Sequence, residues 1–169
     1  MNAKLAAWNA ADPSAATDAM LSCCGARRWA AAMVALRPIE SEEKFCAAAG
    51  DVWSTMEVTD WMEAFACHPR IGERKAAQAT TQSKEWSKQE QSAASGADAA
   101  VLAMLAEKNA EYEEHFGFTY IVCATGKTAE EMLAILERRL NNDRETEMRE
   151  AAEQQRQITG IRLRKWLAE

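Results

Sequence analysis

The chain has 169 residues, of which 48% are hydrophobic and 27% are charged, and its formal net charge is −6. This size predicts one domain, residues 1–169, that can bury a core of its own. Few Gly, Pro, Tyr and Phe beside abundant Ala, Leu, Glu, Met and Lys favour helices over sheets. The negative charge argues against binding to nucleic acids or to anionic membranes, because both require a basic face.

The five cysteines are typical of a protein from a reducing compartment. Their number is odd, and adjacent Cys23 and Cys24 do not have the spacing of a secreted disulfide scaffold. No apolar run approaches the length of a membrane span, and the N-terminal residues lack the continuous apolar stretch of a signal peptide. We therefore expect a cytoplasmic protein that contacts no membrane.

The predicted elements are almost all helices. Asp12 with Pro13, Ser41, and the capping box of Thr128 with Glu131 are typical helix starts, and Gly117 is a typical stop. Together with the apolar periodicity they predict about eight helices, over residues 12–24, 27–36, 41–56, 59–67, 83–95, 98–116, 128–140 and 142–169.

Two stretches between these helices have other patterns. Residues 70–82 are small and polar, which predicts a loop. Residues 118–124 are apolar and rich in β-formers, but no other stretch offers a strand partner. The sequence thus predicts a single-domain, all-α helical bundle with one short extended segment at 118–124.

His68 is the first candidate for chemistry. It is one of only two histidines and is followed by Pro69. Proline disfavours α geometry in the residue before it, so the helix should end near Cys67 and leave the imidazole at a break, facing a cleft. The near-neutral pKa of histidine suits proton transfer. From this motif alone, a histidine in a surface loop is the alternative interpretation.

The polar segment 87–91 is the second candidate. Ser87, Glu90 and Gln91 lie three and four residues apart, so one helical face can present a hydroxyl, a carboxylate and an amide. In isolation such a face is typical of a solvated helix surface. Paired with His68, it supplies a carboxylate that orients or charges the imidazole and neutral donors for a polar ligand.

The extended segment and two arginines complete the candidates. Backbone groups of 118–124 need partners if no strand lies beside them, and a ligand rich in amides can supply these, whereas its side chains suit core packing. Arg162 and Arg164 can each bind a carboxylate or ureido oxygen through two hydrogen bonds, although a surface charge is the commoner role. His115 follows two acidic residues on a long helix and is expected at the surface.

Motifs for metals and nucleotides are missing. By residue type, a zinc site could be built from Cys67, His68, His115 and Cys123, but these residues do not have the sequence spacing of known zinc ligands. The sequence also lacks a glycine-rich phosphate loop, a nucleophile elbow and a dinucleotide fingerprint.

Taken together, the motifs resemble those of the 2-oxo-4-hydroxy-4-carboxy-5-ureidoimidazoline (OHCU) decarboxylases of the route from urate to allantoin. The resemblance covers nearly the whole chain and depends on segments that occur in the order of the family. They are residues 67–72 (CHPRIG), 87–91 (SKQEQ), 109–112 (NAEY) with 116–123 (FGFTYIVC), 136–142 (LERRLNN) with Glu145, and 158–163. The N-terminal third matches mainly in pattern, so no site residue is predicted there.

The resemblance implies an all-helical, usually dimeric protein with no metal and no organic cofactor. It implies that His68 is the essential proton donor, and we add Glu90 as a second catalytic residue that holds the substrate hydroxyl. The implied substrate-binding residues are Pro69, Ser87, Lys88, Gln89, Glu90, Gln91, Tyr120, Ile121, Val122, Cys123, Ala124 and Arg162. Arg162 matches the arginine-leucine pair of the family better than Arg164 does.

The expected function is cofactor-free decarboxylation of OHCU to (S)-allantoin and CO₂, the last step of urate degradation to allantoin. Loss of CO₂ leaves electron density that the neighbouring ring system can hold, and protonation from one face sets the stereochemistry of the product. We expect a homodimer that binds this small molecule and no nucleic acid. Two alternatives stay open: a lyase or hydrolase for a related ureide, and a helical interaction module without catalysis.

Overall fold

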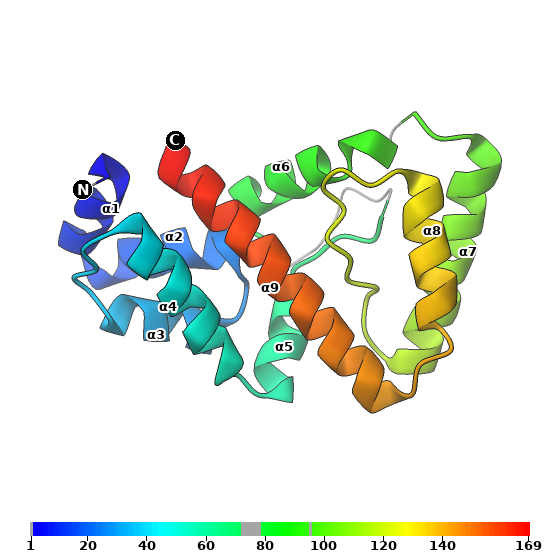
Figure 1. Ribbon diagram of the computed structural model, residues 1–169, viewed down its shortest axis with the longest axis horizontal. Coiled ribbons are helices and arrows are strands. Elements are labelled where there is room, and N and C mark those ends of the chain that lie inside the picture. The colour runs from blue at the N-terminus through cyan, green and yellow to red at the C-terminus, as the bar shows by residue number, and fades with distance from the viewer. Residues whose placement is uncertain (1, 72–78, 95) are drawn as a thin grey trace. The chain divides into compact units, whose positions relative to one another are not determined.

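The computed structural model describes residues 2–71, 79–94 and 96–169. These residues form nine α-helices, one short 3₁₀-helix and no strand, which confirms the predicted all-α class (Figure 1). The α-helices are α1 (Ala3–Ala10), α2 (Pro13–Cys23), α3 (Arg27–Ala35), α4 (Glu42–Ser54), α5 (Val58–Phe65), α6 (Thr81–Glu90), α7 (Ala99–Phe116), α8 (Ala129–Arg139) and α9 (Arg144–Ala168). The 3₁₀-helix is η1 (Ser92–Ala94).

Local capping chemistry sets most of the helix starts. Asp12 caps α2, with Pro13 in the first turn, and Ser41 caps α4. Thr128 and Glu131 form the predicted capping box at the start of α8, in which each side chain accepts a backbone N–H of the other residue. These contacts satisfy N–H groups that have no partner within the helix itself.

The structure corrects several predicted boundaries. The sequence signals do not predict α1, which is alanine-rich and is capped by Asn2. The helix predicted at 83–95 begins at Thr81 and ends at Glu90, and η1 follows it. Residues 72–78 of the predicted loop and Ser95 lie outside the described residues.

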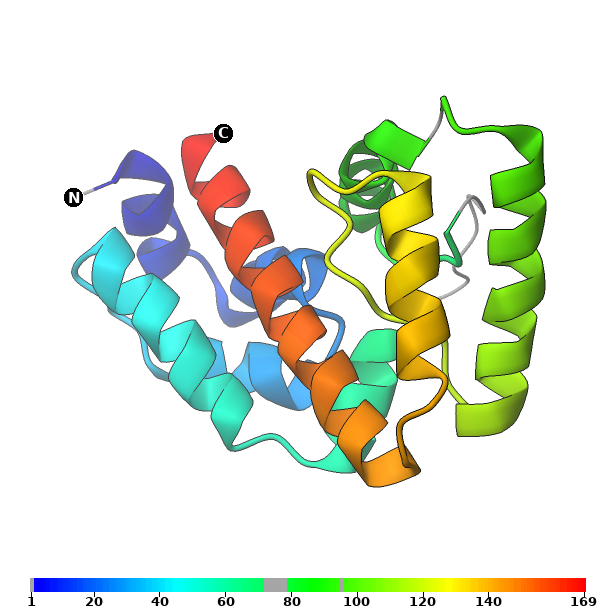
Figure 2. The same cartoon turned by 45° about the vertical axis from the view of Figure 1, so that its right-hand side comes forward.

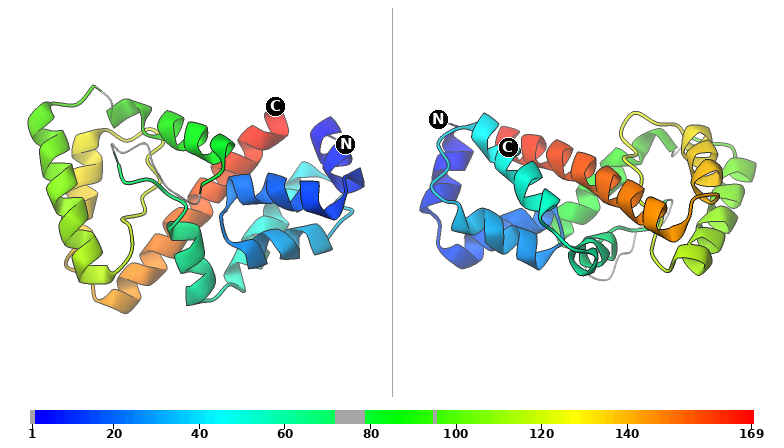
Figure 3. Two further views of the ribbon diagram at one scale, coloured as in Figure 1. Left: turned by 180° about the vertical axis from the view of Figure 1, so that it is seen from behind. Right: turned by 60° about the horizontal axis from the view of Figure 1, so that its bottom comes forward.

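The chain groups into two compact units, and α9 contributes to both. The first comprises residues 1–64 and 156–169, and in it α3 packs against α2 and α4 (Figure 3). Its core is built on tryptophans: the ring centroid of Phe45 lies 5.2 Å from Trp8 and 5.8 Å from Trp166. The indole N–H of Trp29 donates to the carbonyl of Ala49 over 3.1 Å.

The second unit, residues 65–155, is organised around α7 and α8, which lie side by side (Figures 1 and 2). Gly117 ends α7 in the left-handed conformation, with φ +82°, and turns the chain into residues 118–124. This segment belongs to no helix, and no strand pairs with it within the described residues. It is buried from Tyr120 to Ala124.

An aromatic cluster anchors this segment to α7. The ring of Tyr112 lies 5.7 Å from that of Phe118 and 5.3 Å from that of Tyr120. Such pairs stabilise a core beyond the burial of their area. None of the described helices is both long enough and apolar enough to cross a membrane.

Candidate functional site

His68 lies in the turn that follows α5. α5 ends at Phe65, two residues before the predicted end, and the backbone N–H of His68 donates to the carbonyl of Phe65 over 3.1 Å. The imidazole is half-buried, and its Nε2 lies 2.6 Å from Oε1 of Gln155 in α9. Gln155 itself is fully buried. The predicted helix break thus places the histidine ring against a buried amide.

The residues after His68 are tied to α7. Pro69 is buried, and the guanidinium of Arg70 donates two hydrogen bonds to the carboxylate of Glu113, over 2.6 and 2.5 Å. A bidentate pair of this kind restricts orientation as well as distance. It therefore holds the chain in place where it leaves the histidine.

The structure divides the predicted polar segment of α6 into a buried side and an exposed side. Ser87 is buried, while Glu90 and Gln91 are half-buried. Lys88 and Gln89 are exposed. The helical spacing predicts this division, because residues three and four apart share a face. The hydroxyl, carboxylate and amide of the first set are therefore on the side of α6 that faces protein.

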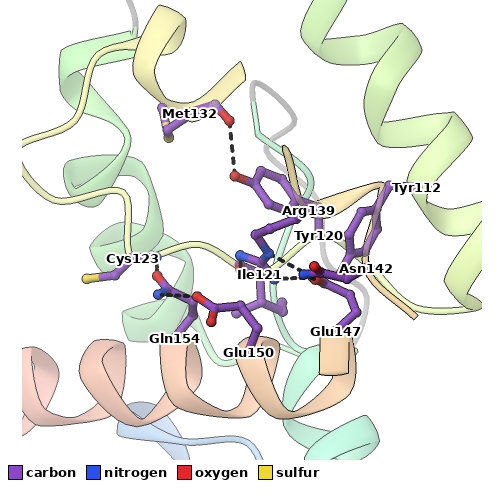
Figure 4. A network of polar contacts seen from close by, with 10 residues as sticks. All are labelled: Tyr112, Tyr120, Ile121, Cys123, Met132, Arg139, Asn142, Glu147, Glu150 and Gln154. Atoms are coloured by element: carbon purple, nitrogen blue, oxygen red, sulfur yellow. Dashed lines mark hydrogen bonds and ion pairs between the residues drawn. The ribbon is translucent and has the colours of Figure 1, made fainter. Parts of the chain in front are cut away.

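The extended segment obtains part of its backbone hydrogen bonding from protein side chains (Figure 4). The N–H of Cys123 donates to Oε1 of Gln154 over 2.8 Å, and the amide of Gln154 donates to Glu150 over 3.2 Å. The carbonyl of Ile121 accepts from Nη1 of Arg139 over 2.6 Å. The predicted need for backbone partners is thus met in part without a ligand.

Lys127 supports the end of this segment. Its Nζ donates to the carbonyl of Cys123 over 2.7 Å, and its backbone N–H donates to that of Ala124 over 2.9 Å. The hydrogen bonds found within the described residues thus leave the N–H groups of Val122 and Ala124 outside this protein network.

Arg139 is held in a buried polar network (Figure 4). Its Nε donates to the carboxylate of Glu147 over 2.7 Å, and both side chains are fully buried. The same carboxylate accepts hydrogen bonds from the hydroxyl of Tyr112 over 2.5 Å and from the amide of Asn142 over 2.9 Å. Burial alone lowers the pKa of Arg139, but the hydrogen bond and charge of Glu147 outweigh it and raise that pKa overall. The guanidinium therefore stays charged.

Tyr120 also belongs to this network. The guanidinium carbon of Arg139 lies 4.9 Å from the centre of its ring, and its hydroxyl donates to the carbonyl of Met132 over 3.0 Å. This hydrogen bond gives the hydroxyl of Tyr120 a partner within the protein. Burial raises the pKa of Tyr120 well above its ordinary value.

The two arginines near the C-terminus differ in exposure. Arg162 is buried in the part of α9 that belongs to the first unit, and Arg164 is exposed. His115 is exposed on α7, as predicted. Among the described residues, no three His, Cys, Asp or Glu side chains are grouped so that they could hold a metal ion.

The structure adds polar residues that the sequence motifs do not single out. Gln155 and Glu147 lie on the buried side of α9, on a stripe that they share with Ala151 and Ile158. Polar residues at the spacing of an apolar stripe indicate buried polar contacts, because a buried polar group requires a hydrogen-bonding partner. In α9 these partners are His68 and Arg139.

Two successive residues of α9 connect the histidine with the extended segment. Gln155 contacts the ring of His68, and Gln154 accepts the backbone N–H of Cys123. The ring of His68 and a row of backbone groups are thereby attached to the same turn of one helix. This arrangement can bind a polar, amide-rich molecule and transfer a proton to it.

Comparisons with known proteins show the family of this chain. The family model described as OHCU decarboxylase matches residues 9–164. The chain is 39% identical over 145 residues to the uric acid degradation bifunctional protein TTL of Arabidopsis thaliana. That match covers 85% of this chain but only 44% of the plant protein. The chain is also 29% identical over 134 residues to the OHCU decarboxylase of Amia calva, covering 79% of this chain and 77% of that protein.

A solved structure of an OHCU decarboxylase is also similar to this chain. The crystal structure of an OHCU decarboxylase in the presence of (S)-allantoin superposes with a TM-score of 0.76 and is 34% identical in sequence. The match covers 88% of this chain and 96% of the other. Since the family model spans far more than half of the sequence, this chain belongs to the OHCU decarboxylase family.

Proposed function

We propose that this chain decarboxylates OHCU to (S)-allantoin and CO₂ without a metal or an organic cofactor. The observation that carries the proposal is the attachment of His68 and of the extended segment to successive residues of α9, Gln155 and Gln154. The family to which the chain belongs supports the choice of substrate.

The reaction requires one bond cleavage and one controlled protonation. The bond between ring carbon C4 and the carboxylate breaks, its electrons form a C4–C5 double bond, and the former C5–N double bond shifts to the nitrogen, which takes a proton. The enol that results loses its hydroxyl proton as C4 becomes a carbonyl, and C5 gains a proton. C5 carries the ureido group, so the face of this last protonation sets the stereochemistry of allantoin.

We assign these roles to residues of the predicted site. His68 delivers the proton to C5 from one face, and Glu90 accepts a hydrogen bond from the C4 hydroxyl. The N–H groups of Val122 and Ala124 would bind carbonyl or ureido oxygens. Arg162 keeps the substrate-binding role that the resemblance to the family implies for it. Preorganised donors of this kind stabilise developing charge without reorganisation during the reaction.

The test is to follow the formation of allantoin from freshly generated OHCU by circular dichroism. We expect the wild type to produce one enantiomer rapidly. His68→Ala should lose about 10²–10⁴-fold in rate, the usual contribution of a general acid. Its far-ultraviolet spectrum and thermal unfolding should match those of the wild type if only the chemistry is lost.

His115→Ala is the matched control, because it removes the other histidine, which is exposed on α7. It should retain the rate and the enantiomeric excess of the wild type. A racemic product at the spontaneous rate with wild type would rule out the decarboxylase and favour a helical interaction module. Normal turnover by His68→Ala would instead remove His68 from the mechanism.

We further propose that the protein is one domain over residues 1–169, forms a homodimer, and resides in the reducing cytoplasm. None of the five cysteines forms a disulfide bond, and burial raises the pKa of the Cys23 and Cys46 thiols, which keeps them in the unreactive protonated form. Sedimentation equilibrium measures the dimer, and a single unfolding transition is the result expected for one domain.

A further inference from the structure

The contact between His68 and Gln155 defines which ring nitrogen carries a proton. Nε2 of His68 lies 2.6 Å from Oε1 of Gln155. A carbonyl oxygen only accepts hydrogen bonds, so this contact requires a proton on Nε2. In histidine, the hydrogen bond made by one nitrogen determines the protonation of the other.

Gln155 is suited to hold a side chain in place. It is fully buried in α9, a helix of 25 residues, so its own side chain has little freedom. The neighbouring Gln154 holds Cys123 of the extended segment. One helical turn thus sets the position of the histidine relative to the backbone groups that we propose as substrate ligands.

We propose that Gln155 is a positioning residue that holds the Nε2 proton of His68, so that the imidazolium delivers its Nδ1 proton to the substrate and is left as the neutral, Nε2-protonated ring. The inference rests on the proposed decarboxylation and deepens it, because it names the atom that transfers the proton. Gln155 is a neutral acceptor. It therefore orients the ring but does not attract the positive charge of the imidazolium. A carboxylate in its place would attract that charge and make the imidazolium a weaker acid.

The first test is a ¹⁵N NMR spectrum of histidine-labelled protein at a pH where the rings are neutral. The chain has two histidines, and exposed His115 serves as an internal reference. We expect His68 to be protonated at Nε2 and unprotonated at Nδ1. Gln155→Leu should shift His68 toward a mixture of the two tautomers and leave the His115 signals unchanged. A proton on Nδ1 of His68 in the wild type would overturn the proposal.

The second test separates kcat from KM with OHCU as substrate. Gln155→Leu should lower kcat about ten- to a hundredfold, the effect seen when partners that orient metal-bound histidines are removed. KM should change little, because the substrate ligands stay in place. Gln155→Glu keeps an acceptor oxygen and should recover part of the lost kcat and the Nε2-protonated ring.

Gln157→Leu is the matched control, since the same change is made at an exposed position of the same helix. It should leave kcat, KM and the NMR spectrum unaltered. Normal kcat in Gln155→Leu would refute the positioning role while the decarboxylation stands. If the wild type itself forms no (S)-allantoin, the proposed function fails, whereas the tautomer of His68 can still be measured.

Discussion

Arg139 is the residue on which the second unit depends most clearly. Its guanidinium connects Glu147 of α9 with the carbonyl of Ile121 in the extended segment. Removing two charges from water is expensive, and a buried pair is often no more stabilising than apolar residues of the same volume. We infer that the pair is important mainly because it fixes the position of the extended segment.

Arg139→Met and Glu147→Met should each destabilise the protein by about 3–5 kcal/mol, because each leaves one buried charge without its partner. The double variant should lose much less than the sum of the two. Urea unfolding of all four proteins gives the coupling energy directly.

An exposed pair on the same helix provides the control for this cycle. Arg149 and Glu145 are in contact at 2.5 Å, but their side chains are 72% and 76% exposed. We expect a coupling of about 0.5 kcal/mol or less there. Equal coupling in the two cycles would show that burial does not determine the strength of the Arg139 pair.

At the scale of elements, the end of α7 decides where the extended segment begins. Gly117 adopts φ +82°, a conformation that L-residues with a Cβ atom avoid. A Cβ at this position would contact nothing within 4 Å, so a substitution tests backbone conformation alone. The aromatic residues that follow are then placed against Tyr112.

Gly117→Ala should destabilise the protein by about 1 kcal/mol, because alanine is strained at positive φ. Gly50→Ala is the comparison: Gly50 lies inside α4, and its Cβ would also contact nothing within 4 Å. That substitution should stabilise the protein by about 0.5–1 kcal/mol. Changes of the same sign in urea unfolding would contradict a conformational role for Gly117.

At the scale of the whole molecule, buried ionisable groups predict how stability depends on pH. Burial raises the pKa of Tyr112 and of Tyr120 above their ordinary value of 10.0. Because the folded-state pKa is the higher one, the stabilisation is complete below pH 10 and is lost as the pH rises above it. Cys23, whose pKa burial also raises, begins to contribute near its ordinary value of 9.0.

The free energy of unfolding should therefore fall steeply above pH 10, by about 1.4 kcal/mol per pH unit for each of the two tyrosines. Tyr120→Phe should reduce this slope by the share of one tyrosine, although it also removes the bond to Met132. Urea unfolding between pH 8 and 11 measures both slopes. An unchanged slope in Tyr120→Phe would show that Tyr120 ionises equally in the folded and unfolded chain.

Much of this protein follows from its sequence because the responsible contacts are local. Asp12, Ser41 and Thr128 cap helices through residues within the same first turn, and Gly117 ends α7 through its own backbone conformation. The break at His68, the extended segment and the family are predictable for the same reason, since short motifs carry them. The start of α1 is also local, because Asn2 caps it, but one pair of apolar residues three positions apart, Leu5 and Trp8, is too little to predict a helix.

The partners of the candidate site could only be decided by the tertiary structure. His68 and Gln155 are 87 positions apart, Cys123 and Gln154 are 31 apart, and Ile121 and Arg139 are 18 apart. A polar residue on the buried stripe of α9 must find a partner, but the stripe does not determine which one. The choice depends on how the elements of the second unit pack, since packing alone brings such distant residues within hydrogen-bonding distance.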